Sequence, residues 1–467
     1  MEEWVIQINA ALSNSNGPSI PEWERHSIYK VPSHFTELHE KAYTPKAVSF
    51  GPYHNGEEHL KPMEEHKHRA LIHFLKRCKK PIGLLSQRME QVVQELRDSY
   101  KSLDQIWVND TPKFLQMMIL DGCFMLQILR TSEHDENDYA ENDPIFGDHG
   151  RQFVVPYILR DMLMLENQLP MTVLRTLIEV ETDHSSQQEN DELLNKLILK
   201  FFGIDYSIKE GCMGKCKHVL DLYRKGRIQM CRKAKPEPTN LIILLNTLIM
   251  LLLKYATTVL TYPITFTLKK CLTPKLKKLF KPKPQRNRFK GSVRELHEAG
   301  IRFSKSNTDN LKDVTFDDGV LKLPHIQVDD STRYIFLNLL AFERLHVGAG
   351  NEVTSYVYFM DNIIDTEADV DILHKNDILC NALECNKAVA QMFNSLAKDI
   401  TVVGADIENE QKKMARYCRK WWKKWRANLI HTYFRNPWST VSLHAAIFLF
   451  ALTTVQTVFT VLPYYYN

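Results

Sequence analysis

Hydrophobic and polar residues alternate with a helical period over most of the chain. Apolar residues between positions 114 and 129 recur at spacings of three and four, and 158–169 shows a similar apolar pattern. Polar, acid-rich segments at 132–144 and 181–192 lie around these stretches and indicate exposed loops. No internal repeat or series of alternating strands is visible. The pattern predicts a mostly α fold.

One short segment carries a β pattern. Asp318-Gly319 suits a tight turn between two strands at 314–316 and 320–323. Directly afterwards, the acids and serine of 329–331 favour a helix N-terminus before the apolar sequence TRYIFLNLLAFERL. We therefore expect a large helical domain with a small β-hairpin element.

An uninterrupted apolar run lies near the C-terminus. Residues 441–466 carry no formally charged side chain, and the run exceeds the roughly 20 residues that cross a bilayer. Trp438 and the tyrosines at 464–466 bracket it as interfacial aromatic residues do. A buried core helix is the alternative. We predict a C-terminal transmembrane helix, a tail anchor at 438–467, and the positive-inside rule then places the bulk of the chain in the cytosol.

The segment before this run predicts a basic amphipathic helix at 411–434. Its apolar residues recur with a helical period, and seven lysines and arginines lie on the other side. Such a helix suits the headgroup layer of an anionic leaflet, whereas a solvated helix packed on the domain is the alternative. The predicted membrane-interface residues are Trp421, Trp422, Trp425, Lys420, Lys423, Lys424 and Trp438.

A second apolar run spans residues 241–266. It contains Asn246 and Lys254, and ten lysines and arginines with no acid follow between 269 and 290. Positive flanks on both sides oppose a single crossing, so an interfacial or re-entrant segment fits better than a second span. Few stacking aromatics are interleaved with these bases, so we expect a membrane surface as partner and no nucleic acid.

Composition adds limits rather than a function. The chain has 467 residues, of which 44% are hydrophobic and 25% charged, so wholesale disorder is excluded. The nine cysteines are scattered without a framework, which favours buried thiols in a reducing compartment. The sequence MEEWVIQINA at the start does not resemble a secretory signal peptide.

Three buried acids are the candidates for chemistry. No phosphate-binding glycine loop, Gly-x-Ser-x-Gly or His-Glu-x-x-His motif occurs. Asp161 and Glu166 lie five residues apart, which on one helix separates them by roughly 140°, so they do not share a face. Asp121, from a neighbouring helix, could meet either one. A structural polar network and a catalytic or ligand-binding site are the two interpretations, and we favour the first.

Two groups of potential metal ligands are weaker. The first is dense in histidine but has Arg69 between His66 and His73, and a guanidinium opposes a cation. The second, Cys212, Cys216 and His218, offers only three local ligands. We predict no metal and no cofactor. The histidines of the first group are His54, His59, His66, His68 and His73.

Several long blocks resemble a plant family known only as domain of unknown function 247, or uncharacterised protein family 0481. The resemblance covers nearly the whole chain from about residue 26 and is poorest at about 224–290. It implies a land-plant protein with a C-terminal membrane anchor and no established enzymatic activity; some grass members are implicated in self-incompatibility. The blocks are 28–67, 118–130, 160–170, 292–303, 319–343, 354–373 and 424–442.

The pattern and the resemblance together predict a plant membrane-anchored recognition or signalling protein that is not an enzyme. We expect a single-pass protein, at the plasma membrane, with the lipid bilayer and an unknown protein as partners. The alternatives are a membrane-associated enzyme of unknown reaction using Asp121, Asp161 or Glu166, and a sensor of lipid headgroups. The expected organisation is an N-terminal extension (1–25), the family domain in two parts (26–230 and 291–437), a variable membrane-proximal insert between them (231–290), and the anchor (438–467).

Overall fold

The computed structural model describes most of the chain. The described residues are 1–13, 25–37, 39–131, 139–182, 186–204, 213–228, 291–398, 400, 407–418, 442, 445–446, 448–450, 452–453 and 456. The chain divides into two units, one formed by Met1–Met230 with Gly291–Asn467 and the other by Cys231–Lys290. The second unit, which includes the run at 241–266, lies outside the described residues.

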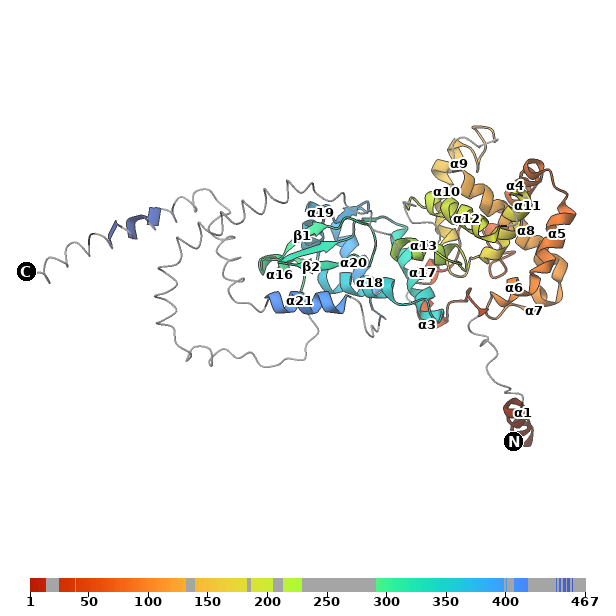
Figure 1. The fold of residues 1–467 in the computed structure, drawn as a ribbon, viewed down its shortest axis with the longest axis horizontal. Coiled ribbons are helices and arrows are strands. Elements are labelled where there is room, and N and C mark those ends of the chain that lie inside the picture. Colours follow the sequence, from red (N-terminus) through yellow and green to blue (C-terminus); the bar gives the residue numbers. More distant parts are fainter. Residues whose placement is uncertain are drawn as a thin grey trace, which may run out of the picture. The chain divides into compact units, whose positions relative to one another are not determined.

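Helix α8 (Thr111–Arg130) forms the core of the N-terminal part of the first unit (Figure 1). Asp110 caps it by accepting a hydrogen bond from Lys113 N at 3.0 Å. Every side chain from Phe114 to Leu129 except Gln116 is buried. The helical pattern predicted here is therefore confirmed. The helices that pack on α8 are α4 (Pro62–Cys78), α5 (Ile82–Gln91), α7 (Gln105–Asn109), α11 (Met171–Thr182) and α12 (Gln187–Phe201).

Within the described part of the chain, α8 is the helix whose length and composition would allow it to cross a membrane. However, 83% of its most apolar window is buried inside the fold, as in a core helix. Gly122 shows how closely α11 approaches, because a Cβ there would lie 2.7 Å from Leu177 and Val173 side-chain atoms. The run predicted to be transmembrane, 441–466, lies largely outside the described residues, so that helix stays a prediction.

The N-terminal part contains further short helices. Two 3-10 turns, at Glu40–Ala42 and Glu58–Leu60, lie in the segment that precedes α4. The remaining helices are α1 (Glu2–Ser13), α3 (Ser33–Thr36), α6 (Val93–Asp98), α9 (Asp148–Phe153), α10 (Val155–Met162) and α13 (Val219–Ile228).

The C-terminal part combines helices with two small sheets. In the larger sheet, β3 (Val320–Leu323) is central, paired with β2 (Thr315–Asp317) in antiparallel and with β1 (Arg302–Lys305) in parallel orientation. The second sheet pairs β4 (Ile326–Val328) with β5 (Leu379–Asn381). The helices of the C-terminal part are α16 (Val293–Glu298), α17 (Thr332–Leu345), α18 (Glu352–Ile363), α19 (Glu367–Lys375), α20 (Asn386–Leu396) and α21 (Glu408–Cys418).

The predicted hairpin and the predicted start of α17 are both confirmed. Asp318 and Gly319 have φ of 43° and 80°, as a tight turn with two left-handed residues requires. Asp329 Oδ1 accepts hydrogen bonds from Ser331 N and Thr332 N, at 3.0 and 2.9 Å, at the start of α17. Strands β1, β4 and β5 were not predicted, because three or four residues are too few to show a period.

Helix α21 is the described start of the predicted basic amphipathic helix. Met414 is fully buried, the ring of Tyr417 lies 5.4 Å from that of Phe316 in β2, and Glu410 Oε2 accepts a hydrogen bond from Phe316 N at 2.9 Å. The apolar side of α21 thus packs on the hairpin, which was the alternative left open for this segment. Residues 419–434 lie outside the described part.

Candidate functional site

The signature segment 160–170 is not a single helix. Helix α10 ends at Met162 and α11 begins at Met171. The residues between them, 163–170, form turns and a loop, which we call the signature loop. The Asn167 amide donates to Asp161 O at 3.1 Å, and the Gln168 amide donates to Met162 O at 2.6 Å. These side chains occupy carbonyl groups that a continuing helix would need for its own amides. The prediction that both acids of this segment lie on one helix is therefore wrong.

Asp161 binds three consecutive backbone amides. Its Oδ2 accepts hydrogen bonds from Lys46 N at 2.9 Å, Ala47 N at 2.6 Å and Val48 N at 3.1 Å. Burial raises the pKa of the carboxyl to about 6, although the amides and the Arg160 guanidinium favour the charged form. Its Oδ1 is buried without a hydrogen-bond partner. The carboxyl group thus holds the backbone of residues 46–48 in place.

Asn167 continues this contact along the same backbone. Its Oδ1 accepts a hydrogen bond from Phe50 N at 2.7 Å, and its Nδ2 donates to Val48 O at 3.0 Å. Gly51, which follows Phe50, has a φ of 74°, and a Cβ at this position would lie 2.9 Å from Gln168 O. Only glycine therefore fits where the segment passes the signature loop.

Asp121 contacts the same stretch but is paired with a lysine. Its Oδ2 accepts a hydrogen bond from Gly51 N at 2.8 Å, and its Oδ1 lies 2.7 Å from Lys67 Nζ. Lys67 is fully buried, donates to Ser49 O at 2.7 Å and lies 2.6 Å from Glu64 Oε1. Burial opposes the charged amine, but the two carboxylates outweigh it and raise the pKa of Lys67. The partner of Asp121 is thus Lys67, not an acid of the signature segment.

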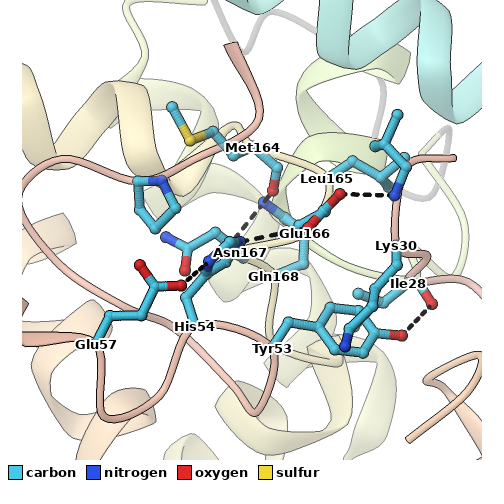
Figure 2. A network of polar contacts seen from close by, with 12 residues as sticks. Ile28, Lys30, Tyr53, His54, Glu57, Met164, Leu165, Glu166, Asn167 and Gln168 are labelled. Atoms are coloured by element: carbon cyan, nitrogen blue, oxygen red, sulfur yellow. Dashed lines mark hydrogen bonds and ion pairs between the residues drawn. The ribbon is translucent and has the colours of Figure 1, made fainter. Parts of the chain in front are cut away.

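Glu166 joins the signature loop to two more positions of the N-terminal segment (Figure 2). Its Oε1 accepts a hydrogen bond from Val31 N at 2.7 Å, and its Oε2 lies 3.5 Å from His54 Nε2. On the other side of the ring, Glu57 Oε1 lies 2.7 Å from His54 Nδ1. Burial would lower the pKa of His54, but the two carboxylates outweigh it and raise that pKa.

The three candidate acids are therefore brought to one segment, residues 31–54, and each binds its backbone or an ionic partner there. Two small pockets in the described part of the chain have volumes of about 20 and 40 Å³, and none of the three acids lines them, although Phe35, His39 and Tyr43 of the same segment line the smaller one. The contacts of Asp121, Asp161 and Glu166 are those of a structural polar network. They supply no observation in favour of the enzyme alternative.

The potential metal ligands are engaged in other contacts. His66 Nδ1 lies 2.8 Å from the Arg69 guanidinium, which repels a cation. His218 is fully buried, with Nε2 3.0 Å from Ser27 O and Nδ1 accepting from Asp221 N at 3.2 Å. Cys212 lies outside the described residues. Among the residues with described positions, no group of three or more His, Cys, Asp or Glu side chains could hold a metal ion.

The environment of His218 makes the fold sensitive to acid. Burial lowers the pKa of its ring from 6.5 to about 4. The unfolded state therefore binds more protons between these values, so this contribution to stability is complete above pH 6.5 and is lost as the pH falls towards 4. The loss amounts to about 3 kcal/mol. We expect the free energy of unfolding, measured with urea, to decline as the pH falls over this range. The decline should be smaller in the His218→Gln variant.

An exposed histidine provides the control for this titration. His68 lies on the outer side of α4, so His68→Gln is expected to keep the wild-type pH dependence. If His218→Gln also kept it, the buried ring would not be the titrating group.

A second buried ion pair, which was not predicted from the sequence, joins the two parts of the domain. The Arg224 guanidinium, in α13, lies 2.7 Å from Glu343 Oε1 in α17, and both side chains are buried. Glu343 also accepts hydrogen bonds from Val353 N and Thr354 N at the start of α18, at 3.0 and 2.8 Å. The clue in the sequence is a charged residue at the end of an apolar helix pattern, which needs a partner when buried.

The signature loop also reaches the C-terminal part. Asn338 in α17 accepts a hydrogen bond from Leu165 N at 2.8 Å and donates to Ala42 O at 2.9 Å. The predicted membrane-interface residues Trp421, Trp422, Trp425, Lys420, Lys423, Lys424 and Trp438 lie outside the described part, so their role stays a prediction.

Comparison with known proteins places the whole chain in one group. The UPF0481 protein At3g47200 of Arabidopsis thaliana is 29% identical over 94% of this chain and 86% of its own length. The putative UPF0481 protein At3g02645 of the same plant is 25% identical over 97% of this chain and 93% of its own length. No solved structure matches the chain. A family model described as a plant protein of unknown function matches residues 28–452, and the chain therefore belongs to the DUF247 family.

Proposed function

We propose that the chain is a tail-anchored, single-pass membrane protein whose helical domain binds a protein partner in recognition or signalling. The observation that carries the proposal is the uncharged apolar run at 441–466, longer than a bilayer requires. Phe448, Phe450 and Leu452 within it are helical and at least half exposed, so the fold leaves their apolar surface for another environment.

The polar groups of this run suit a lipid environment. Thr453 Oγ1 donates to Leu449 O and Phe450 O, both at 2.9 Å, so its hydroxyl is satisfied within its own helix. The bases of 412–424 precede the run, which favours a cytosolic domain by the positive-inside rule. We propose the plasma membrane as the location and no nucleic-acid partner. The role in recognition or signalling, without catalysis, rests on the family resemblance and on the structural use of the three acids.

Removing residues 438–467 is expected to release the chain from membranes. The full chain should stay in the membrane pellet after a wash at high pH, whereas the shortened chain should appear in the supernatant. In sealed vesicles with the cytosolic face outward, added protease should reach the domain. Retention of the shortened chain in the pellet would mean that the segments at 241–266 or 411–434 carry the attachment.

The partner is best sought with the anchor as the variable. Proximity labelling in plant cells with the full chain and with the chain lacking 438–467 should give different sets of neighbours. A protein that binds the helical domain itself should be labelled by the full chain and by the shortened chain when the two are present in the same compartment. Labelling of lipid-modifying enzymes alone would argue against recognition of a protein.

A further inference from the structure

Four basic residues come close to Tyr334 and to the segment 39–46, where the two parts of the domain meet. The Arg160 guanidinium carbon lies 3.9 Å from the centre of the Tyr334 ring, and Lys46 Nζ lies 5.9 Å from the same centre. Arg333, next to Tyr334 in α17, directs its Nη2 to His39 Nδ1 at 2.9 Å. Lys41 adjoins them, since its carbonyl oxygen accepts a hydrogen bond from Arg160 at 3.1 Å. We call these four cations the Tyr334 cluster.

The charge of this cluster is balanced only in part within the described part of the chain, where the Asp161 carboxyl interacts electrostatically with the Arg160 guanidinium. None of its four cations forms an ion pair with a carboxylate there, in contrast to Lys67 and Arg224, which are both paired. Asp161 follows Arg160 in α10, and its Oδ2 is bound to three backbone amides. The other acids on the same elements are used in the α17 cap or form no ion pair with these cations. They are Glu37, Asp329, Asp330 and Glu343, of which Glu343 is paired with Arg224; the side chain of Glu40 lies outside the described part.

The cluster combines a buried charge with accessible ones. Arg160 is 7% exposed, and its Nε is buried with no hydrogen-bond partner. Lys41 and Lys46 are exposed, while Arg333 and Tyr334 are half-buried. Several positive charges in one region make the local electrostatic potential more positive. An anion would therefore bind favourably here. Surface lysines that merely solubilise a fold have no reason to gather around a buried guanidinium.

We propose that the Tyr334 cluster binds a phosphate group, carried by a soluble molecule or by a lipid headgroup. A phosphate presents several charged oxygens, which several converging ammonium and guanidinium groups bind with charge-assisted hydrogen bonds. Lys46 and Arg333 supply the direct contacts, Lys41 the rim, and Arg160 the buried charge beneath them. The inference does not depend on the proposed anchor or on a protein partner.

The test measures phosphate binding by the full chain in a neutral detergent. Inorganic phosphate and pyrophosphate are titrated by calorimetry, and mixed micelles with phosphatidic acid or phosphatidylserine form the lipid arm. Lys46→Gln and Arg333→Gln should each weaken binding roughly tenfold or more, as the loss of one charged contact does. Lys76→Gln, an exposed lysine on α4, should leave it unchanged. Lys46 is exposed, so its variant is expected to keep the fold even if the Arg333 variant does not.

The outcomes separate the two sources of phosphate. Binding of pyrophosphate that depends on Lys46 supports a soluble ligand. Binding only to phosphatidic acid micelles, again dependent on Lys46 and absent with phosphatidylserine, supports a lipid headgroup. Equal binding by the Lys46→Gln and Lys76→Gln chains would overturn the proposal, and so would no binding in any arm.

Discussion

Replacing Lys67 by methionine is expected to lower the free energy of unfolding by about 3–5 kcal/mol, because it leaves a buried carboxylate without its cation. Lys67 and Asp121 are both fully shielded from solvent and lie 2.7 Å apart, so no water can replace the lost amine. Ser49 O would lose its donor as well. Urea unfolding of the full chain, followed by near-ultraviolet circular dichroism, measures the change.

A second substitution separates the charge from the shape of the site. Adding Asp121→Asn to Lys67→Met removes the unpaired charge and keeps an oxygen that can accept from Gly51 N. The double variant should therefore be more stable than Lys67→Met alone. Lys76→Met, exposed on the same helix, is the matched control and should change stability little. A double variant less stable than the single one would contradict a role for the ion pair.

Replacing Asp161 by alanine is expected to cost about 3 kcal/mol or more, because three backbone amides lose their acceptor at once. The residues 46–48 would then lose their attachment to the signature loop. Asp161→Asn should cost less, since its side-chain oxygen can still accept hydrogen bonds. Asp317→Ala, exposed in β2, should be close to neutral. Equal losses for the alanine and asparagine variants would show that hydrogen bonding is not the main contribution.

The pH dependence of the stability of the same variants tests the role of the Asp161 carboxyl independently. Because burial raises the pKa of Asp161 from 3.8 to about 6, the folded state binds more protons between these values. Stability from this group therefore rises as the pH falls from 6 to 3.8, by about 3 kcal/mol. This is opposite in sign to the effect of His218. Asp161→Asn should thus show a steeper loss of stability on acidification than the wild type.

Much of the fold could be predicted from short-range patterns. Helix α8, the β2–β3 hairpin and the start of α17 each depend on residues within one element, so spacing, turn chemistry and capping were sufficient. Lys67 could also have been found. It lies on the buried stripe of α4 with Met63, Ala70 and Phe74, which places a charge inside the core and requires a partner.

The candidate site was predicted only in part. Of the three acids chosen as buried groups, Asp121 and Asp161 are buried and Glu166 is partly exposed, and a structural network was the favoured interpretation. Their partners could not be predicted, because Asp161 binds amides more than a hundred residues away and Asp121 binds a lysine on another helix. The break after Met162 was missed because it arises from side-chain amides that compete with the helix for carbonyl groups.

The amino-acid sequence by itself determined where helices form, where the hairpin turns and which faces are apolar, since these depend on contacts between near neighbours. It also determined the uncharged run near the C-terminus and the charges before it. Only the tertiary structure decided that three acids hold one N-terminal segment, that Arg224 meets Glu343, and that Arg160 and Lys46 lie over the Tyr334 ring. These contacts join residues far apart in the chain, and the chain must fold before a buried charge can find its partner.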